Sequence, residues 1–342
     1  MKIGSVDLVS PFAIAPMAGM TDTAFRRLVK RRGGCGLVVT EMVSAEGLIR
    51  GIDRTLEYAE YTEEERPVSV QIFGGDPEKM AAAAQVVEGM GADIVDVNMG
   101  CPVPKIAKHN AGCSLMREPA HAAGVIAAMT KAVSIPVTVK MRAGWNDGDR
   151  NAPTLAKMVE DAGAAAIAVH GRTAAQSYSG TADWDLVARI ADELTIPVFG
   201  SGDCTEPEHI VQRMASGVEG VLVGRGVLRN PWILAQATQL AAGRTPLVVT
   251  LEDRGRFLLD YIDLLMSERV RDEGAPQQSH DRWVINKLRA LGSWYTKGLE
   301  GGSHLRTAIN SAASLSALRD LIGAFFFGAC DPAGPVATGR HY

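Results

Sequence analysis

The strongest constraint on the fold is a repeated alternation of short apolar runs with longer helical patterns, from residue 11 to about 240. Eight of these runs have the length and composition of buried strands. They span residues 12–15, 37–40, 68–73, 94–98, 137–141, 166–170, 197–200 and 220–223. Strands that alternate with helices form a parallel sheet, either open and doubly wound or closed as a (β/α)8 TIM barrel. The count of eight favours the barrel.

An open dinucleotide-binding sheet would carry a glycine fingerprint after its first strand. The segment there reads APMAGMTD and lacks G-x-G-x-x-G, which disfavours a Rossmann site. Around residues 241–250 the alternation stops, and the remaining patterns are helical. We therefore predict an α/β protein with a (β/α)8 barrel over 1–242, a small all-α helical bundle over 243–328 and a flexible tail over 329–342.

Composition and charge narrow the class of protein further. With 46% apolar and 22% charged residues the chain can bury a sizeable core, and a net charge of −4 argues against a wholly basic nucleic-acid coat. The five cysteines are odd in number and show no C-x-x-C spacing, and no His or carboxylate cluster has metal-ligand spacing. No signal-like segment or stretch of about 20 apolar residues is present. We expect a cytoplasmic protein without metal or membrane contact, and a monomer, although the oligomeric state stays open.

In a (β/α)8 barrel the chemistry gathers where the strands end at their carboxyl side. In this sequence those positions are polar although the strands are apolar. They are Pro16, Met17, Ala18, Glu41, Gln71, Asn98, Cys101, Lys140, Arg142, His170, Arg172, Ser201, Gly202, Asp203, Gly224 and Arg225. Each one alone could be a cap of the barrel mouth, but the set as a whole indicates a ligand site.

The last two strand ends, FGSGDC and VLVGRG, are rich in glycine. Loops after the seventh and eighth strands of barrels often bind phosphate through backbone N–H groups, and Arg225 can add a charged contact. The alternative is that these glycines only turn tight corners. Gln71 and Asn98 can donate and accept together at the edge of a flavin or pyrimidine ring, and Lys140 could stabilise negative charge on a reduced flavin. His170 could do the same, or it could bridge two loops.

Seven segments together resemble the tRNA-dihydrouridine synthases, in particular the bacterial B-type branch. They are APMAGMTDTAFR, VQIFGG, DVNMGCPVPKI, VKMRAGW, VHGRT, YSGTADW and VGRG followed by NPW. The resemblance is strong over residues 10 to about 235 and looser, through WYTKGL, in the helical part. It implies an FMN enzyme with an N-terminal barrel and a C-terminal tRNA-binding domain, which uses NADPH to reduce the C5–C6 double bond of uridines in tRNA.

The same resemblance assigns roles to residues of this chain. Cys101 matches the proton donor. The flavin-binding positions match Pro16, Met17, Ala18, Gln71, Lys140, His170, Gly202, Asp203, Gly224 and Arg225. The chain departs from the family at Ser201, where an asparagine is common; a serine keeps a donor and an acceptor but has a shorter reach, while backbone contacts to a phosphate could survive.

The implied reaction is physically coherent. C6 of the uracil ring receives a hydride from the reduced flavin, and C5 receives a proton from a thiol whose ordinary pKa of about 8.5 keeps it protonated near neutrality. The base must leave its stack, which favours loop uridines. NADPH has no motif of its own, so we expect it to use the same cleft before the RNA arrives.

Basic residues of the helical part suggest where RNA binds. Residues 282–306 carry five Lys or Arg and one acid, Glu300, whereas 244–342 as a whole is nearly neutral. Residues at i, i+4, i+7 and i+11 from Val284 form an apolar stripe, and cations lie nearly opposite. The predicted RNA-binding residues are Arg282, Lys287 and Arg289, with Lys105 and Lys108 from the barrel. A solvated amphipathic helix would show the same pattern.

Two other readings stay open on the residues alone. An FMN barrel that acts on a free pyrimidine, as dihydroorotate dehydrogenases do, would not need some 95 further residues with a basic helix. A non-catalytic RNA-binding protein would not need Cys101 and the flavin-compatible strand ends. The sequence does not indicate which uridine is modified or whether NADPH is preferred to NADH.

Overall fold

The computed structural model describes residues 1–107, 110–267 and 277–328. Lys108, which the sequence predicts to contact RNA, and the predicted tail over 329–342 lie outside these ranges. Within the described part the chain forms a strand-rich unit and a helical unit, and contacts between residues divide the two after Leu247.

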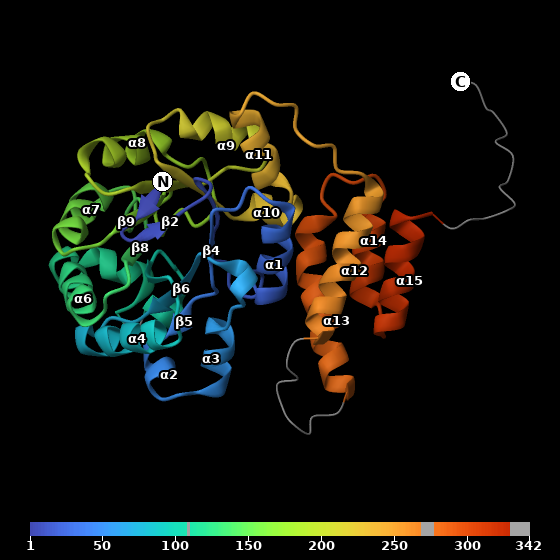
Figure 1. The fold of residues 1–342 in the computed structure, drawn as a ribbon, viewed down its shortest axis with the longest axis horizontal. Coiled ribbons are helices and arrows are strands. Elements are labelled where there is room, and N and C mark those ends of the chain that lie inside the picture. The colour runs from blue at the N-terminus through green and yellow to red at the C-terminus, as the bar shows by residue number, and fades with distance from the viewer. Residues whose placement is uncertain (108–109, 268–276, 329–342) are drawn as a thin grey trace, which may run out of the picture. The chain divides into compact units, whose positions relative to one another are not determined.

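Eight parallel strands form the centre of the first unit and close on themselves (Figure 1). They are β3 (Phe12–Ile14), β4 (Leu37–Val39), β6 (Val68–Phe73), β7 (Ile94–Met99), β8 (Val137–Arg142), β9 (Ala166–His170), β10 (Val198–Ser201) and β11 (Gly220–Val223). Each pairs in parallel with its neighbour, and the pairing of β4 with β6 completes the ring. The predicted (β/α)8 barrel is therefore confirmed.

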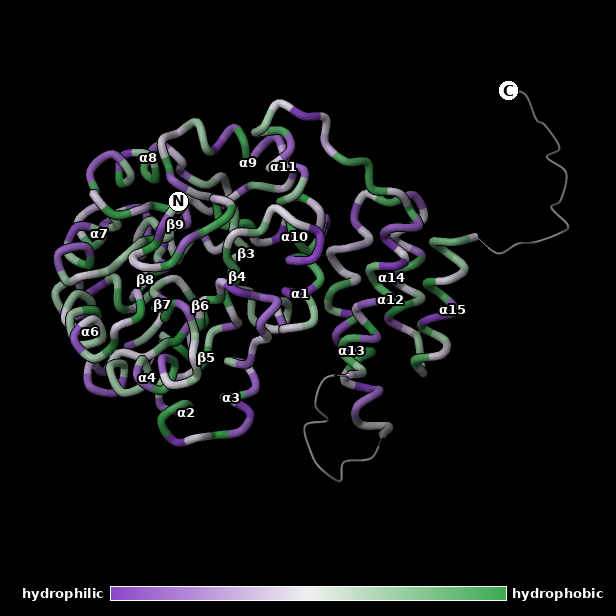
Figure 2. The backbone as a smooth tube through the Cα atoms, in the orientation of Figure 1, coloured by the Kyte–Doolittle hydropathy of each residue, from purple (hydrophilic) through white to green (hydrophobic). Residues whose placement is uncertain are grey.

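Helices follow the strands around the barrel. The longer ones are α1 (Thr23–Arg32), α4 (Pro77–Gly89), α6 (Pro119–Ala132), α7 (Ala152–Asp161), α8 (Trp184–Glu193), α9 (Pro207–Met214) and α11 (Ile233–Ala241). The helices α4, α6, α7 and α9 have proline in the first turn. In α4 the side chain of Asp76 also caps the helix, since it accepts from the N–H groups of Glu78 and Lys79. Figure 2 shows hydrophilic and hydrophobic colour alternating along these helices, as expected where one face packs on the sheet.

Short elements that the sequence analysis did not predict complete the unit. They are the hairpin β1 (Lys2–Ile3) and β2 (Val6–Asp7), the strand β5 (Val43–Ser44), and the helices α2 (Ala45–Ile49), α3 (Asp53–Ala59), α5 (Pro104–Ala107) and α10 (Arg225–Arg229), with 3-10 turns at Glu63–Glu65 and Gly112–Arg117. Ile3 and Leu8 belong to an apolar cluster with the first residues of several strands, among them Leu37 and Ile94. The hairpin therefore closes the amino ends of the strands, which leaves the carboxyl ends for a ligand.

The second unit consists of α12 (Leu251–Ser267), α13 (Gln277–Tyr295), α14 (Gly302–Ser311) and α15 (Leu315–Phe326). The apolar stripe predicted on α13 is buried, with Val284, Leu288, Leu291 and Tyr295 almost inaccessible to solvent. Tyr295 stacks on Phe257 of α12 with a centroid distance of 5.6 Å, and its hydroxyl donates to the Arg254 carbonyl at 3.0 Å. The predicted C-terminal all-α bundle is confirmed. No described helix combines the length and apolarity needed to cross a membrane.

Candidate functional site

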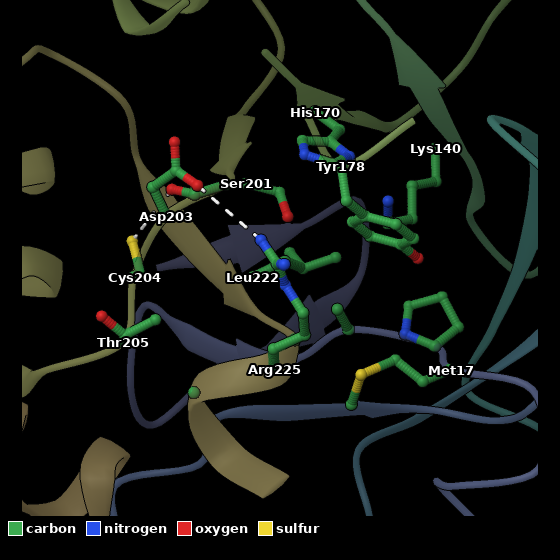
Figure 3. Close-up of a pocket in the computed structure, with 15 residues that line it drawn as sticks. Met17, Lys140, His170, Tyr178, Ser201, Asp203, Cys204, Thr205, Leu222 and Arg225 are labelled. Atoms are coloured by element: carbon green, nitrogen blue, oxygen red, sulfur yellow. Dashed lines mark hydrogen bonds and ion pairs between the residues drawn. The ribbon is translucent and has the colours of Figure 1, made fainter. Parts of the chain in front are cut away.

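A pocket opens among the carboxyl ends of β3, β8, β9, β10 and β11 (Figure 3). It holds about 590 Å³ of space, including its opening to solvent. Predicted site residues that line it are Pro16, Met17, Lys140, His170, Ser201, Gly202, Asp203, Gly224 and Arg225. The topology thus brings together residues that lie up to 209 positions apart in the chain, from Pro16 to Arg225.

Four other predicted residues do not line this pocket. Ala18 is exposed just beyond Met17, and Cys101 follows the end of β7. Gln71 and Asn98 are buried in the barrel, where the Nδ2 of Asn98 donates to the Oε1 of Gln71 at 2.8 Å. Their amide groups are thus already engaged with protein partners, whereas the sequence alone suggested contacts to a ring.

The glycine-rich end of the pocket depends on the backbone at Gly202, which has a φ of +128°. A Cβ placed there would lie 2.6 Å from the Cβ of Ala182 and 3.2 Å from the ring of His170. Any other residue would be strained at this positive φ and its Cβ would clash with Ala182, so this position requires glycine. At Gly224 a Cβ would point to Met17 and Ala15, which line the pocket, and would narrow it.

The carboxylate of Asp203 is held from several sides. Its oxygens accept from the guanidinium of Arg172 and from the N–H of Ala182, both at 2.7 Å, and Arg225 lies 3.8 Å away. Burial alone would raise the pKa of Asp203, but these hydrogen bonds and the two guanidinium groups lower it. Asp203 is therefore ionised at neutral pH and fixes Arg172, whose side chain is 2% exposed.

Positive charge exceeds negative charge around the pocket, because Lys140 and Arg225 line it with Asp203, and two further guanidinium groups lie near His170. Burial, followed by the charge of Arg142, lowers the pKa of Lys140 to about 8. Burial and then the cations Lys140, Arg142, Arg172 and Arg225 lower the pKa of His170 to about 2, so this imidazole is neutral at any physiological pH. His170 can donate or accept a hydrogen bond but cannot supply a proton as an acid. The arrangement suits an anionic ligand.

Cys101 sits in a tightly held turn after β7. Its N–H donates to the Oδ1 of Asn98 at 2.9 Å, and its carbonyl accepts from the N–H of Cys113 at 3.1 Å. The side chain is half-buried, and burial raises the pKa of the thiol although Arg142 and Lys140 act in the opposite direction. The thiol is therefore protonated near neutrality and lies within electrostatic reach of Lys140 in the pocket.

The remaining described cysteines differ from Cys101 in exposure. Cys35, Cys113 and Cys204 are buried, and burial raises their pKa values to about 11, 11 and 12. Within the described ranges no three His, Cys, Asp or Glu side chains gather as metal ligands would.

Arg142 and Tyr178 contribute to the site in a way that the sequence did not reveal. The guanidinium of Arg142 donates to the carbonyls of Gly100, Thr173 and Ser177 at 2.8, 3.0 and 2.9 Å. It thereby joins the Cys101 turn to the loop after β9. Tyr178 lines the pocket from that loop, with Arg225 4.9 Å and Arg142 5.9 Å from its ring centroid. The residues YSG indicate a turn, but the sequence does not show that this turn places Tyr178 at the pocket.

The cations predicted to contact RNA lie in both units. Lys105 of α5 and Arg282 of α13 are exposed, and the ammonium of Lys287 lies 5.7 Å from the ring centroid of Trp283. Arg289 has a structural contact, because it donates to the carbonyl of Ala312 at 2.9 Å.

The fold and the pocket define a (β/α)8-barrel protein with a glycine-lined pocket at its strand ends, into which Lys140 and Arg225 bring positive charge. A sequence model of the family described as dihydrouridine synthase matches residues 13–322, and the chain belongs to this family. A "Probable tRNA-dihydrouridine synthase" of Rickettsia prowazekii is 36% identical, with 97% of this chain and 99% of that protein covered. The "tRNA-dihydrouridine synthase B" of Xanthomonas campestris is also 36% identical, with coverage of 97% and 98%. Among solved structures, FabK from Thermotoga maritima is 20% identical over 66% of this chain and 61% of its own, with a TM-score of 0.41.

Proposed function

We propose that the protein is an FMN-dependent enzyme that uses NADPH to reduce the C5–C6 double bond of uridines in tRNA to 5,6-dihydrouridine. The observation that carries the proposal is the Cys101 turn, which keeps a protonated, half-buried thiol beside a cation-rich pocket at the strand ends. Family membership and the names of full-length relatives support the same reaction.

The residues of the pocket fit FMN. Gly202, Gly224 and Arg225 would hold the phosphate, because the two glycines leave space that a Cβ would fill and the guanidinium supplies charge. Lys140 would face the polar edge of the ring system, and Pro16 and Met17 would pack against it. When bound and reduced by NADPH, FMN would supply the hydride for C6 of the uracil ring.

The protein itself must then deliver the proton for C5. The raised pKa of the Cys101 thiol keeps the proton on sulfur until a basic carbon develops next to it. His170 is excluded as the acid because its pKa of about 2 leaves it neutral. Lys140, with a pKa of about 8, is charged in most molecules at neutral pH and can stabilise negative charge on the bound ring.

Substrate binding would involve both units of the chain. We infer that Lys105, Arg282 and Lys287 contact tRNA phosphates, and that Trp283 provides an aromatic surface beside Lys287. Arg289 would contribute mainly by fixing α13 to Ala312. NADPH would enter the same pocket before the RNA, so that excess NADPH should inhibit turnover.

The test is direct formation of the product. Purified protein is loaded with FMN and incubated with NADPH and a tRNA transcript that carries no modifications, and dihydrouridine is measured by mass spectrometry of the digested RNA. We expect dihydrouridine in the complete mixture and none when FMN or NADPH is omitted. Reduction of free uracil or orotate without any product in tRNA would contradict the proposal and favour a small-molecule substrate.

A further inference from the structure

A layer of polar side chains lies inside the barrel where apolar packing is usual. Gln71, Asp96 and Thr138 stand side by side in the register of β6, β7 and β8. Asp96 is 6% exposed and does not line the pocket. Its two carboxylate oxygens accept from the Nε2 of Gln71 and from the hydroxyl of Thr138, each at 2.6 Å. A buried carboxylate in this position needs an explanation, because burial raises its free energy.

The hydrogen bonds continue from Asp96 to the Cys101 turn. The Oε1 of Gln71 accepts from the Nδ2 of Asn98 at 2.8 Å. The Oδ1 of Asn98 then accepts from the N–H groups of Gly100 and Cys101 at 3.1 and 2.9 Å. Two primary amides thus connect a carboxylate at one end with two backbone donors at the other.

The two ends determine how both amides are oriented. Asp96 accepts at both of its oxygens, so Gln71 turns its NH₂ group toward Asp96 and its oxygen toward Asn98. The backbone N–H groups only donate, so Asn98 must turn its oxygen toward the Cys101 turn. The two requirements agree in one arrangement. Without an acceptor at position 96 the NH₂ group of Gln71 would lose its partner and the amide could rotate, which would turn this NH₂ toward the NH₂ of Asn98 and break the bond that holds Asn98.

We propose that Asp96 is a positioning residue for Cys101, which acts through the Gln71–Asn98 pair to hold the turn that carries the thiol. The inference rests on the proposed function, because it takes Cys101 as the proton donor. Asp96 itself touches neither the pocket nor the thiol. Its role is to supply the acceptor that fixes the orientation of the Gln71 amide and, through it, the position of Asn98.

The test compares two substitutions at Asp96 in the FMN-loaded protein. Asp96→Leu removes the acceptor and should slow single-turnover reduction of uridine in tRNA by about a hundredfold, the effect of displacing a reacting group by about 1 Å. Reduction of the flavin by NADPH should keep its rate, because that step does not use Cys101. Asp96→Asn should stay close to wild type in both steps, since its oxygen can face Gln71 while its NH₂ faces the Thr138 hydroxyl.

Asp93 offers a matched control on the same pair of strands. Its carboxylate also bonds across to β6, through the N–H of Val68 at 2.8 Å, but at the amino ends of the strands. Asp93→Leu should therefore leave the uridine step unchanged. Wild-type uridine reduction in Asp96→Leu, or equal losses in Asp96→Leu and Asp96→Asn, would overturn the inference. Product formation by wild type together with its loss in Cys101→Ala shows separately that the proposed function holds.

A second variant of nearly the same shape, Gln71→Glu, tests the inference even if Asp96→Leu fails to fold. A protonated glutamic acid can donate to Asp96 and accept from Asn98, as the amide does, but a carboxylate cannot donate. Lys140 is the other titratable group that acts on Asp96. We therefore expect the rate of uridine reduction by flavin-loaded Gln71→Glu to fall with increasing pH, and to fall more steeply than the rate of wild type. A pH profile identical to that of wild type would contradict the inference.

Discussion

Replacement of Lys140 by methionine should stabilise the flavin-free protein and at the same time weaken its flavin site. The pKa of this ammonium is lowered from 10.5 to about 8, mainly by burial. At about 1.36 kcal/mol per pKa unit, a charged Lys140 lowers the free energy of unfolding at pH 7 by at most about 3 kcal/mol. Methionine has a similar length and no charge, so most of this amount should be recovered.

The sign of the pH dependence follows from the lowered pKa. The folded protein binds this proton less tightly than the unfolded chain, so its stability rises with pH between about 8 and 10.5. The gain in the free energy of unfolding of Lys140→Met over wild type should therefore fall from about 3 kcal/mol at pH 7 to about 1.4 kcal/mol at pH 9.5. The assay is urea unfolding of the two flavin-free proteins at both pH values, combined with FMN titration at pH 7.

Lys157→Met is the matched control, because the exposed Lys157 pairs at the surface with Glu160 and Asp161. It should change stability little, and by the same amount at both pH values. If Lys140→Met lowered the free energy of unfolding at pH 7, the charge of Lys140 would not destabilise the flavin-free protein as argued. If the variant bound FMN as tightly as wild type, Lys140 would not contribute to the flavin site.

Four further substitutions test other parts of the protein. Gly202→Ala should reduce FMN affinity strongly, because its φ of +128° and the contact of 2.6 Å with Ala182 resist any side chain; FMN titration measures this. Arg142→Lys should lower the free energy of unfolding by about 2–4 kcal/mol, because an ammonium cannot reach all three carbonyls that the guanidinium joins; urea unfolding measures this. Arg282→Glu should weaken tRNA binding by roughly three- to tenfold at low salt with unchanged stability. Arg289→Glu should also destabilise the helical unit, since it removes the bond to Ala312; a comparison of gel-shift and thermal-unfolding data separates the two effects.

The barrel could be predicted from the sequence because its signals are local. Each strand is a short apolar run, and each run ends at polar residues that a closed parallel sheet must bring to one rim. Nine of the predicted pocket residues consequently line one pocket. The strand β5 and the hairpin of β1 and β2 escaped prediction because two-residue strands carry no periodicity.

Other features of the site depend on contacts between distant segments. Asp96 looks like one acidic residue inside an apolar run, and its partners Gln71 and Thr138 become visible only in the register of three strands. Tyr178 reaches the pocket because Arg142, 36 positions earlier in the chain, fixes its loop. Helical periodicity predicts Arg289 on the polar face of α13, but it could not reveal that the guanidinium donates to the carbonyl of Ala312.

The central claim is that Cys101 supplies the proton in a reaction whose hydride comes from the bound cofactor. The most direct measurement is a single-turnover experiment in which wild type and Cys101→Ala are loaded with FMN, reduced with NADPH without oxygen, and mixed with unmodified tRNA. Both proteins should accept electrons from NADPH at the same rate, and the variant should form dihydrouridine about 10²- to 10⁴-fold more slowly. Equal rates of dihydrouridine formation in the two proteins would contradict the claim.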